Sequence, residues 1–147
     1  MKSFKDLKVK DRKIIENPAD ILNFIGGGKA EFSLYSKKTG VQLSFRTKVV
    51  KKHNNNIYIY TDTHCVGGIG KINNIKPLYC VKTSILYSIE YKAIKWFIEA
   101  IINQNKNRLD QVHVLHHNRC SRCGRKLVTE GSVKTGIGPI CSLYIEE

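Results

Sequence analysis

Long apolar stretches are missing from this sequence. No run of hydrophobic residues approaches the roughly 20 residues that a membrane-spanning helix requires. The first residues, Met1–Asp6, lead into no apolar core of a secretory signal peptide. We therefore expect a soluble, intracellular protein without a membrane partner.

Acidic residues are also scarce. The 147 residues include 25 Lys and Arg but only 12 Asp and Glu, which gives a net charge of +13 at pH 7. Between Glu31 and Glu90 the only acid is Asp62. A long segment of one charge suits a polyanion, and nucleic acid is the commonest polyanion inside a cell. The simpler alternative is a basic surface that serves only solubility. The basic residues of this segment are Lys37, Lys38, Arg46, Lys48, Lys51, Lys52, Lys71, Lys76 and Lys82.

Familiar catalytic motifs are absent as well. The sequence has no Walker motif, no paired-acid metal site and no nucleophile elbow. Its glycine clusters, at residues 26–28 and 67–70, lack the strand-to-helix context of a phosphate-binding loop, so turns explain them better. With only Asp62 in the middle of the chain, an acid-dependent nuclease has few positions for its carboxylates. We predict a binding protein that is not an enzyme, and an enzyme with an unrecognised site is the remaining alternative.

The overall composition predicts a folded chain. Hydrophobic residues make up 41% and charged residues 25%, as in ordinary globular domains. The length fits one compact domain with a metal-stapled tail. We predict a basic α+β domain over residues 1–111, in which residues 1–16 form a basic arm, and a zinc-binding module over residues 112–147.

Alternating apolar and polar residues predict a sheet. The alternation over residues 30–34 runs into the turn-like segment Lys37–Gly40, which indicates a strand entering a hairpin. The return strand, residues 41–49, has an apolar face for the core and carries Arg46 and Lys48 on the opposite face. Further strands are expected at residues 57–61, around 69–72, around 78–83 and at 112–115.

Two helices are predicted. Asn17 caps the first, and Pro18 suits its first helical position. Ser88 caps a longer one, because apolar residues repeat at three and four residues from Ile94 to Ile101. The predicted fold is α+β, with a small, mostly antiparallel sheet packed by one long helix and a C-terminal zinc module.

Basic and aromatic residues of the middle strands suggest a nucleic-acid platform. Tyrosines on one strand and basic residues on its neighbour would stack bases and contact phosphates of a single strand. Plain cross-strand packing is the alternative explanation for the tyrosines. The predicted contact residues are Arg46, Lys48, Lys51, Lys52, Tyr58 and Tyr60.

Three of the five cysteines have metal-ligand spacing. Cys120 and Cys123, followed by Gly124, have the form of a zinc knuckle, and Cys141 follows Pro139 at a predicted helix start. This layout is treble-clef-like. A thiol redox pair uses the same Cys-x-x-Cys spacing, but it usually opens a helix after a strand. The remaining Cys65 and Cys80 are expected to be reduced and buried.

A fourth zinc ligand has to come from upstream of the knuckle. His116 and His117 precede Cys120 by four and three residues, and either could fold back across it. Three thiolates and one imidazole leave no open position for water, so we expect one structural Zn²⁺ without a catalytic role.

The segment from His116 to Cys141 resembles a zinc-binding domain of unknown function that is common in phage and prophage proteins. That domain is similar to the tail of some phage helicases of the Swi/Snf type and occurs in small stand-alone phage proteins. In the latter, residues much like Gly27–Leu34 and Lys38–Gly40 precede the zinc module. The resemblance covers about residues 26–141, and it departs after Leu127, where a proline is expected before Ser132.

The resemblance implies His116, Cys120, Cys123 and Cys141 as the ligands, because the family's histidine tends to precede the first cysteine by four positions. It also implies a cytoplasmic location in an infected or prophage-carrying host cell. The favoured function is a phage-type, zinc-containing protein that binds single-stranded or non-specific nucleic acid. The alternative is a phage effector that binds and inhibits a host protein, such as a defence nuclease. Neither hypothesis fixes an oligomeric state.

Overall fold

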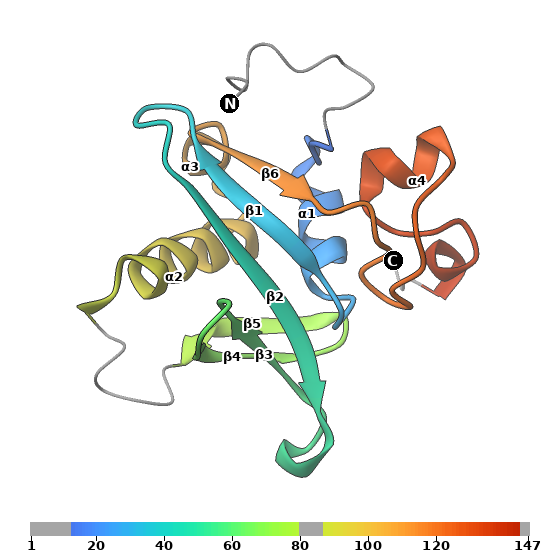
Figure 1. The fold of residues 1–147 in the computed structure, drawn as a ribbon, viewed down its shortest axis with the longest axis horizontal. Helices are drawn as coiled ribbons and strands as arrows, with labels where there is room; N and C mark the ends of the chain where they lie inside the picture. The colour runs from blue at the N-terminus through green and yellow to red at the C-terminus, as the bar shows by residue number, and fades with distance from the viewer. Residues whose placement is uncertain (1–12, 80–86, 145–147) are drawn as a thin grey trace.

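The computed structural model describes residues 13–79 and 87–144. Its strands form one six-stranded antiparallel sheet in the order β5-β4-β3-β2-β1-β6 (Figure 1). The strands are β1 (Glu31–Ser36), β2 (Gln42–Val50), β3 (Asn56–Tyr60), β4 (Cys65–Lys71), β5 (Asn74–Tyr79) and β6 (Val112–His116). The helices are α1 (Pro18–Ile25), α2 (Ile89–Ile102), α3 (Lys106–Leu109) and α4 (Glu130–Thr135), with short 3₁₀ helices at Lys51–His53 and Cys141–Tyr144.

The predicted hairpin is formed by β1 and β2. The backbone N–H of Gly40 donates to the carbonyl of Ser36 at 2.8 Å, and that of Ser36 donates to Val41 at 2.9 Å, which closes the turn. The hairpin pairs Phe32 with Phe45 across the two strands. Period-two alternation therefore gives the sheet an inner apolar face and an outer polar face, as the sequence predicted. The outer face carries Glu31, Ser33, Tyr35, Ser44, Arg46, Lys48, Tyr58 and Tyr60.

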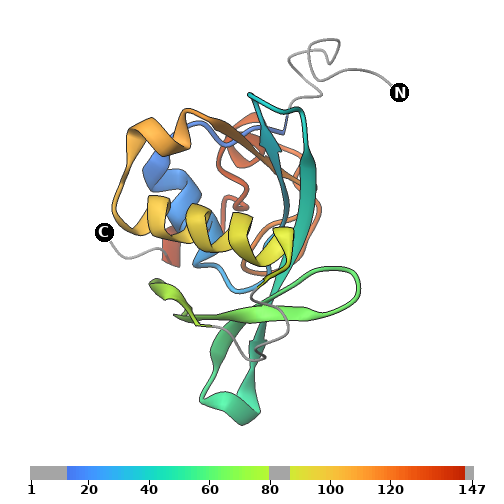
Figure 2. The ribbon, with the colours of Figure 1, turned by 90° about the vertical axis from the view of Figure 1, so that its left-hand side faces the viewer.

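The sheet curls around the helices. Irregularities in strand pairing occur between β3 and β4 and between β4 and β5, and such bulges bend and twist a sheet. The curl brings β4 and β5 into contact with α2. Figure 2 shows α1 and α2 on one side of the β1–β2 hairpin, with β4 and β5 turned beneath α2. The predicted strand around residues 78–83 corresponds to β5 as far as Tyr79, and its remainder lies outside the described residues.

The core is shared by two helices, whereas the sequence predicted one long helix across the sheet. Asn17 caps α1, accepting a hydrogen bond from the N–H of Ala19 at 2.8 Å, and Ser88 caps α2 through the N–H of Tyr91 at 3.1 Å. The buried side chains of the helical layer are Ile21, Phe24 and Ile25 from α1 and Tyr91, Ile94, Phe97, Ile98, Ala100 and Ile101 from α2. An amphipathic pattern identifies each helix but not how two helices divide one sheet face between them.

The N-terminal segment lies along the free edge of β6. Ile14 forms a bridge with Leu115, the N–H of Ile15 donates to Val114, and Ile15 is only 1% exposed. Residues 13–15 of the predicted basic arm are thus part of the fold, and residues 1–12 lie outside the described residues. The predicted module boundary at residue 112 coincides with the start of β6, which pairs with β1 as a strand of the sheet.

The C-terminal module docks on α1 and on the glycine turn that follows it (Figure 1). A Cβ placed on Gly27 would lie 2.3 Å from Ser121 Oγ, and one on Gly136 would lie 2.3 Å from the Phe24 ring. The N–H of Lys29 donates to the Ser121 carbonyl at 2.6 Å. This interface requires residues without side chains, which explains glycine at both positions.

In the described ranges, 13–79 and 87–144, none of the helices combines the length and apolar character needed to cross a membrane.

We expect Gly27→Ala to lower the free energy of unfolding by about 1–3 kcal/mol, because the added methyl group overpacks the Ser121 contact. Gly131→Ala is the matched control, since a Cβ there meets nothing within 4 Å and the residue lies in α4. Alanine at an open helical position stabilises by roughly 0.5–1 kcal/mol. Urea titrations of both variants measure the difference, and equal stabilities would contradict the docking described.

Candidate metal centre and basic sheet face

The first two cysteines of the centre lie on a tight turn. A bridge between Arg119 and Lys126 closes the base of this turn, and the N–H of Gly124 donates to the Cys120 carbonyl at 2.9 Å. Gly124 has φ = 78°, in the left-handed region that glycine adopts at little cost. This local geometry presents Cys120 and Cys123 together, as a knuckle does.

The third cysteine returns to the knuckle by way of α4. Thr129 caps α4, and Gly136 ends it with φ = 76°. Cys141 then opens a short 3₁₀ helix, in which the N–H of Ser142 donates to Gly138 at 2.9 Å. The predicted helix start after Pro139 is therefore present as a single 3₁₀ turn, and the intervening α4 was missed by the sequence analysis.

The sulfur atoms of Cys120, Cys123 and Cys141 all lie within 4.8 Å of one another. Zinc–thiolate bonds of about 2.3 Å in a tetrahedron separate sulfurs by about 3.8 Å, so a small contraction would bring the three onto one ion. Cys120 is buried, Cys141 is half-buried and Cys123 is exposed. Among the described residues no cysteine forms a disulfide, and Cys65 lies apart on β4. Cys80 lies outside the described residues.

The electrostatics of the three thiols favour a cation between them. Burial opposes ionisation of Cys120, but hydrogen bonds from the backbone N–H groups of Gly138, Cys123 and Arg122 outweigh it and lower its pKa. Burial and the hydrogen bonds to Cys123 and Cys120 raise the pKa of Cys141 to about 11, and the charges of those thiols add to this shift. The backbone thus stabilises the thiolate of Cys120, whereas the thiol of Cys141 resists ionisation beside the other two cysteines. A divalent ion at this position would remove that resistance.

Neither candidate histidine joins the cysteine group. His116 lies on the inner face of β6, opposite Phe32, and is only 1% exposed. Its Nδ1 accepts the N–H of Asn118 at 3.0 Å, and its Nε2 is hydrogen-bonded to the Val133 carbonyl at 2.5 Å. His117 Nε2 is hydrogen-bonded to Ser33 Oγ at 2.9 Å on the outer face. Within the described residues, the metal-ligand group consists of the three cysteines alone.

The positions of the two histidines follow from β6, the strand predicted at residues 112–115. Alternation along β6 directs His116 into the core and places His117 on the opposite side, where each ring is hydrogen-bonded to groups other than the cysteines. His116 instead connects β6 with α4 through Val133. Recognising this role requires knowing that α4 exists and where it packs.

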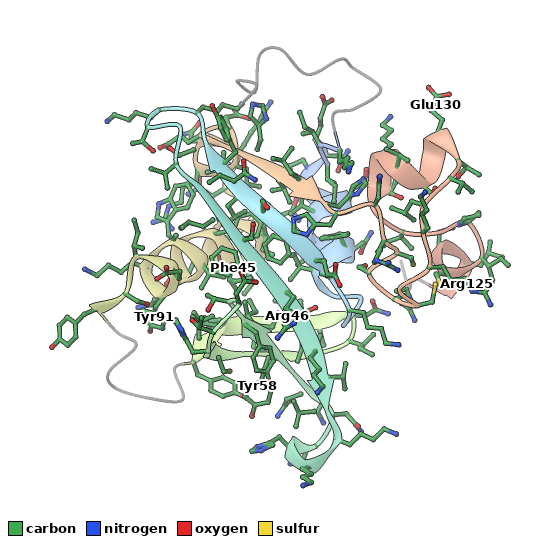
Figure 3. All side chains as sticks on the ribbon, in the orientation of Figure 1. Phe45, Arg46, Tyr58, Tyr91, Arg125 and Glu130 are labelled. Atoms are coloured by element: carbon green, nitrogen blue, oxygen red, sulfur yellow. The ribbon has the colours of Figure 1, made fainter. Side chains whose placement is uncertain are left out.

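The predicted nucleic-acid residues lie on one face of the sheet. Strand pairing sets Arg46 opposite Tyr60 and Lys48 opposite Tyr58. Figure 3 looks onto this outer face and labels Arg46 and Tyr58. Lys51 and Lys52 are exposed in the 3₁₀ helix after β2, so they extend the basic residues of that strand.

The two tyrosines differ in accessibility. Tyr58 is 8% exposed, because Tyr79 and His53 pack edge-on against it with ring centroids at 6.1 Å and 5.4 Å. The Tyr79 hydroxyl also donates to that of Tyr58 at 3.2 Å. Tyr60 is half-buried and lines a pocket of about 180 Å³ with Arg46. Tyr58 therefore packs against its neighbours, as the alternative of plain cross-strand packing predicts. Tyr60 is the tyrosine whose ring is accessible from one side.

Two basic residues at the sheet–knuckle junction escaped the sequence analysis. Lys29 and Arg119 line a second pocket, of about 420 Å³, together with Arg46 and Glu31. Arg119 donates from its guanidinium to the Gly124 carbonyl at 3.1 Å. Only the pairing of β6 with β1 brings the knuckle beside β2, so no local pattern in the sequence indicates this cluster.

Comparison with known proteins gives one result. Residues 111–142 match DUF6011, a family of unknown function. The matched segment spans β6, the knuckle, α4 and all three clustered cysteines. No curated protein and no solved structure matches the chain significantly. The match and the cysteine cluster confirm part of the predicted resemblance, namely a domain of unknown function that could hold a metal ion. A phage origin stays a prediction.

We expect the purified protein to contain one metal ion per chain and Cys120→Ser to lose it, since two thiolates cannot replace the cluster. Cys65→Ser, which removes a thiol on β4 outside the cluster, should retain the ion. Elemental analysis after gel filtration measures the metal content of each variant. Equal metal content in both variants, or none in the wild type, would refute the centre.

His116→Ala is expected to lower the free energy of unfolding by about 1–3 kcal/mol, because it leaves the N–H of Asn118 and the carbonyl of Val133 without partners. The metal content should stay near that of the wild type. Absorption spectra of the Co²⁺-substituted protein report the ligands directly. A changed spectrum in His116→Ala but not in His117→Ala would instead make His116 the fourth ligand.

Proposed function

We propose that this protein binds nucleic acid, chiefly single strands with little sequence preference, through the outer face of its sheet. The observation that supports this most directly is the pairing of Arg46 with Tyr60 and of Lys48 with Tyr58 on that face. Cations beside an aromatic ring can contact phosphates while the ring stacks a base. Tyr60 is the proposed stacking residue, because its ring has the accessible side.

The distribution of charge favours the same partner. Arg46 and Glu31 line both outer pockets. The larger pocket, of about 420 Å³, is also lined by Lys29 and Arg119. A basic path would thus run from the sheet to the knuckle, and the exposed Lys51 and Lys52 would extend it past the end of β2. Within the described residues the one ion pair joins Arg108 to Glu99 and involves none of the basic residues of this path. Glu31 is a carboxylate that lines both pockets.

The metal we propose is one structural Zn²⁺. Thiolate donors select zinc over oxygen-preferring ions such as magnesium. Zinc bound by Cys120, Cys123 and Cys141 would fix the knuckle and, with it, the neighbouring Arg119. In this proposal the ion supports the binding surface and takes no part in chemistry. A phage-type protein acting in the cytoplasm of a host cell is the setting that the resemblance implies.

A host-protein effector is the second candidate, and one observation favours it. Val128 and Ile140 are 81% and 64% exposed and line a pocket of about 430 Å³ beside Arg125 and Lys126. Exposed apolar side chains rimmed by charge are typical of protein-binding surfaces. Affinity purification with nuclease treatment separates the candidates. A partner that survives the treatment but is lost in Val128→Glu supports the effector.

Replacing Arg46 and Lys48 together with glutamine is expected to flatten the salt dependence of binding. Each lost phosphate contact removes about 0.7 from the slope of log K against log salt for a single strand, so the pair removes about 1.4. The control replaces Lys37 and Lys38, two exposed lysines of the β1–β2 turn, with glutamine.

Filter-binding titrations at several salt concentrations measure both slopes, after melting curves have shown that the variants fold. If replacing Lys37 and Lys38 flattened the slope of log K against log salt as much as replacing Arg46 and Lys48, the net charge of the protein, and not this face, would determine the slope. No binding of DNA or RNA at micromolar protein in low salt would exclude the proposed function and leave the host-protein effector.

A further inference from the structure

A basic pocket lies where the outer face of the sheet meets the knuckle. Its volume is about 420 Å³, and we call it the junction pocket. Its three cationic side chains come from three separate segments: Lys29 precedes β1, Arg46 lies on β2, and Arg119 directly precedes Cys120. All three cationic residues are exposed. The other residues that line the junction pocket are Glu31, Thr47 and Gly124.

Strand pairing brings these segments side by side. Glu31 of β1 is paired with Arg46 of β2. On the other side of β1, residues 117–121 are hydrogen-bonded to the Glu31 carbonyl at 3.1 Å and to the Lys29 N–H at 2.6 Å. Arg119 is the middle residue of that segment, so it and Arg46 flank β1 with their backbones about two strand spacings, or roughly 9.6 Å, apart. Two long side chains can contact one ligand group across this distance, and the junction pocket is the space that they share.

The guanidinium of Arg119 is held by the knuckle itself. It donates to the Gly124 carbonyl at 3.1 Å. A guanidinium has five N–H donors, so this bond orients the group and leaves other donors for a ligand. Within the described residues the one ion pair joins Arg108 to Glu99. None of the three cations of the junction pocket is therefore engaged in an ion pair with a described carboxylate.

The charge of the junction pocket fits a phosphate at the end of a strand. The three cations contribute +3 and Glu31 contributes −1, so the side chains that line the pocket carry a formal charge of +2. A phosphate monoester, as at a strand end, carries about −1.5 to −2 at pH 7. Each phosphodiester inside a strand carries only about −1. The positive charge of the pocket is therefore balanced by a terminal phosphate and not by an internal one.

We propose that the junction pocket binds the terminal phosphate of a nucleic-acid strand whose other nucleotides lie on the outer face. The inference rests on the proposed binding of nucleic acid to that face, and it adds the chemical group that is recognised. A terminal phosphate has three non-bridging oxygens that accept hydrogen bonds, so Lys29, Arg46 and Arg119 can each contact one of them. A phosphodiester has only two such oxygens.

The position of the junction pocket agrees with the path proposed for the strand. Arg46 and Glu31 line both this pocket and the smaller outer pocket of about 180 Å³, which contains Tyr60. A strand whose terminal phosphate lies in the junction pocket can therefore continue past Arg46 towards Tyr60, the proposed stacking residue. The protein would then recognise the ends of cut or processed strands in preference to the interior of long ones.

The test compares short single strands of one sequence that carry a 5′-phosphate, a 3′-phosphate or hydroxyls at both ends, made in DNA and in RNA. Each is titrated with the full-length protein at one salt concentration. We expect one phosphorylated strand to bind about tenfold tighter than its hydroxyl-ended counterpart, because hydrogen bonds to a charged group contribute about that factor. The strand that shows this preference identifies the end that is bound. Adenosine 5′-monophosphate should compete much less well, because it lacks the contacts with the rest of the face.

Substitutions in the junction pocket should change this preference selectively. Lys29→Gln and Arg119→Gln are each expected to reduce it to about threefold or less. Glu31→Gln should increase it, because the formal charge of the pocket rises to +3. Melting curves establish that each variant folds, and Lys29→Gln keeps the backbone N–H that donates to Ser121.

Arg125→Gln is the matched control, since it removes the same charge from an exposed arginine that does not line the junction pocket. Figure 3 shows Arg125 on the side of the knuckle away from Arg46. This variant should keep the preference for the phosphorylated strand.

Equal affinity for phosphorylated and hydroxyl-ended strands would overturn the terminal-phosphate site and leave the binding of nucleic acid standing. A preference that persists in both Lys29→Gln and Arg119→Gln would place the terminal phosphate elsewhere on the protein and also overturn it. Competition by adenosine 5′-monophosphate as strong as that by the phosphorylated strand would assign the pocket to free nucleotides instead. Absence of binding by every strand would remove this inference together with the proposed function.

Discussion

The antiparallel pairing of β6 with β1 is the constraint on which the candidate sites depend. It places His117 on the outer face beside Glu31, turns His116 into the core and sets the knuckle beside β2. The alternation of side chains along a strand makes these consequences inseparable, because a shift of one residue would exchange the two histidines. The bridge of Ile14 to Leu115 protects the other edge of the same strand and helps to fix its position.

The cysteine module and the basic face form one connected structure. Gly27 and Gly136 allow the module to approach α1 closely, and Arg122 donates to the Asn73 side chain at 3.5 Å. Arg119 precedes Cys120 directly and lines the outer pocket that contains Arg46. Ordering of the knuckle by a metal would therefore also order part of the basic surface, which gives a structural zinc a role in binding without any chemistry at the ion.

The outer face of the sheet and the apolar surface of the cysteine module suit different partners. Binding needs positive charge and one accessible ring, which Arg46, Lys48 and Tyr60 provide. The apolar surface around Val128 and Ile140 lies beside the cysteines and suits a protein partner better than a polyanion.

The sequence by itself determined two of the helices, the hairpin and the three clustered cysteines. Caps at Asn17 and Ser88, alternation in the hairpin and the Cys120–Cys123 spacing are local signals, so each was predictable without the fold. Tertiary structure alone decided which segments share a face. It engaged His116 with Val133 in place of the cysteine group, covered Tyr58 with Tyr79, and added Lys29, Arg119 and His117 to the neighbourhood of Arg46. Strand pairing between segments far apart in the chain decides these contacts, and no pattern within a single segment encodes them.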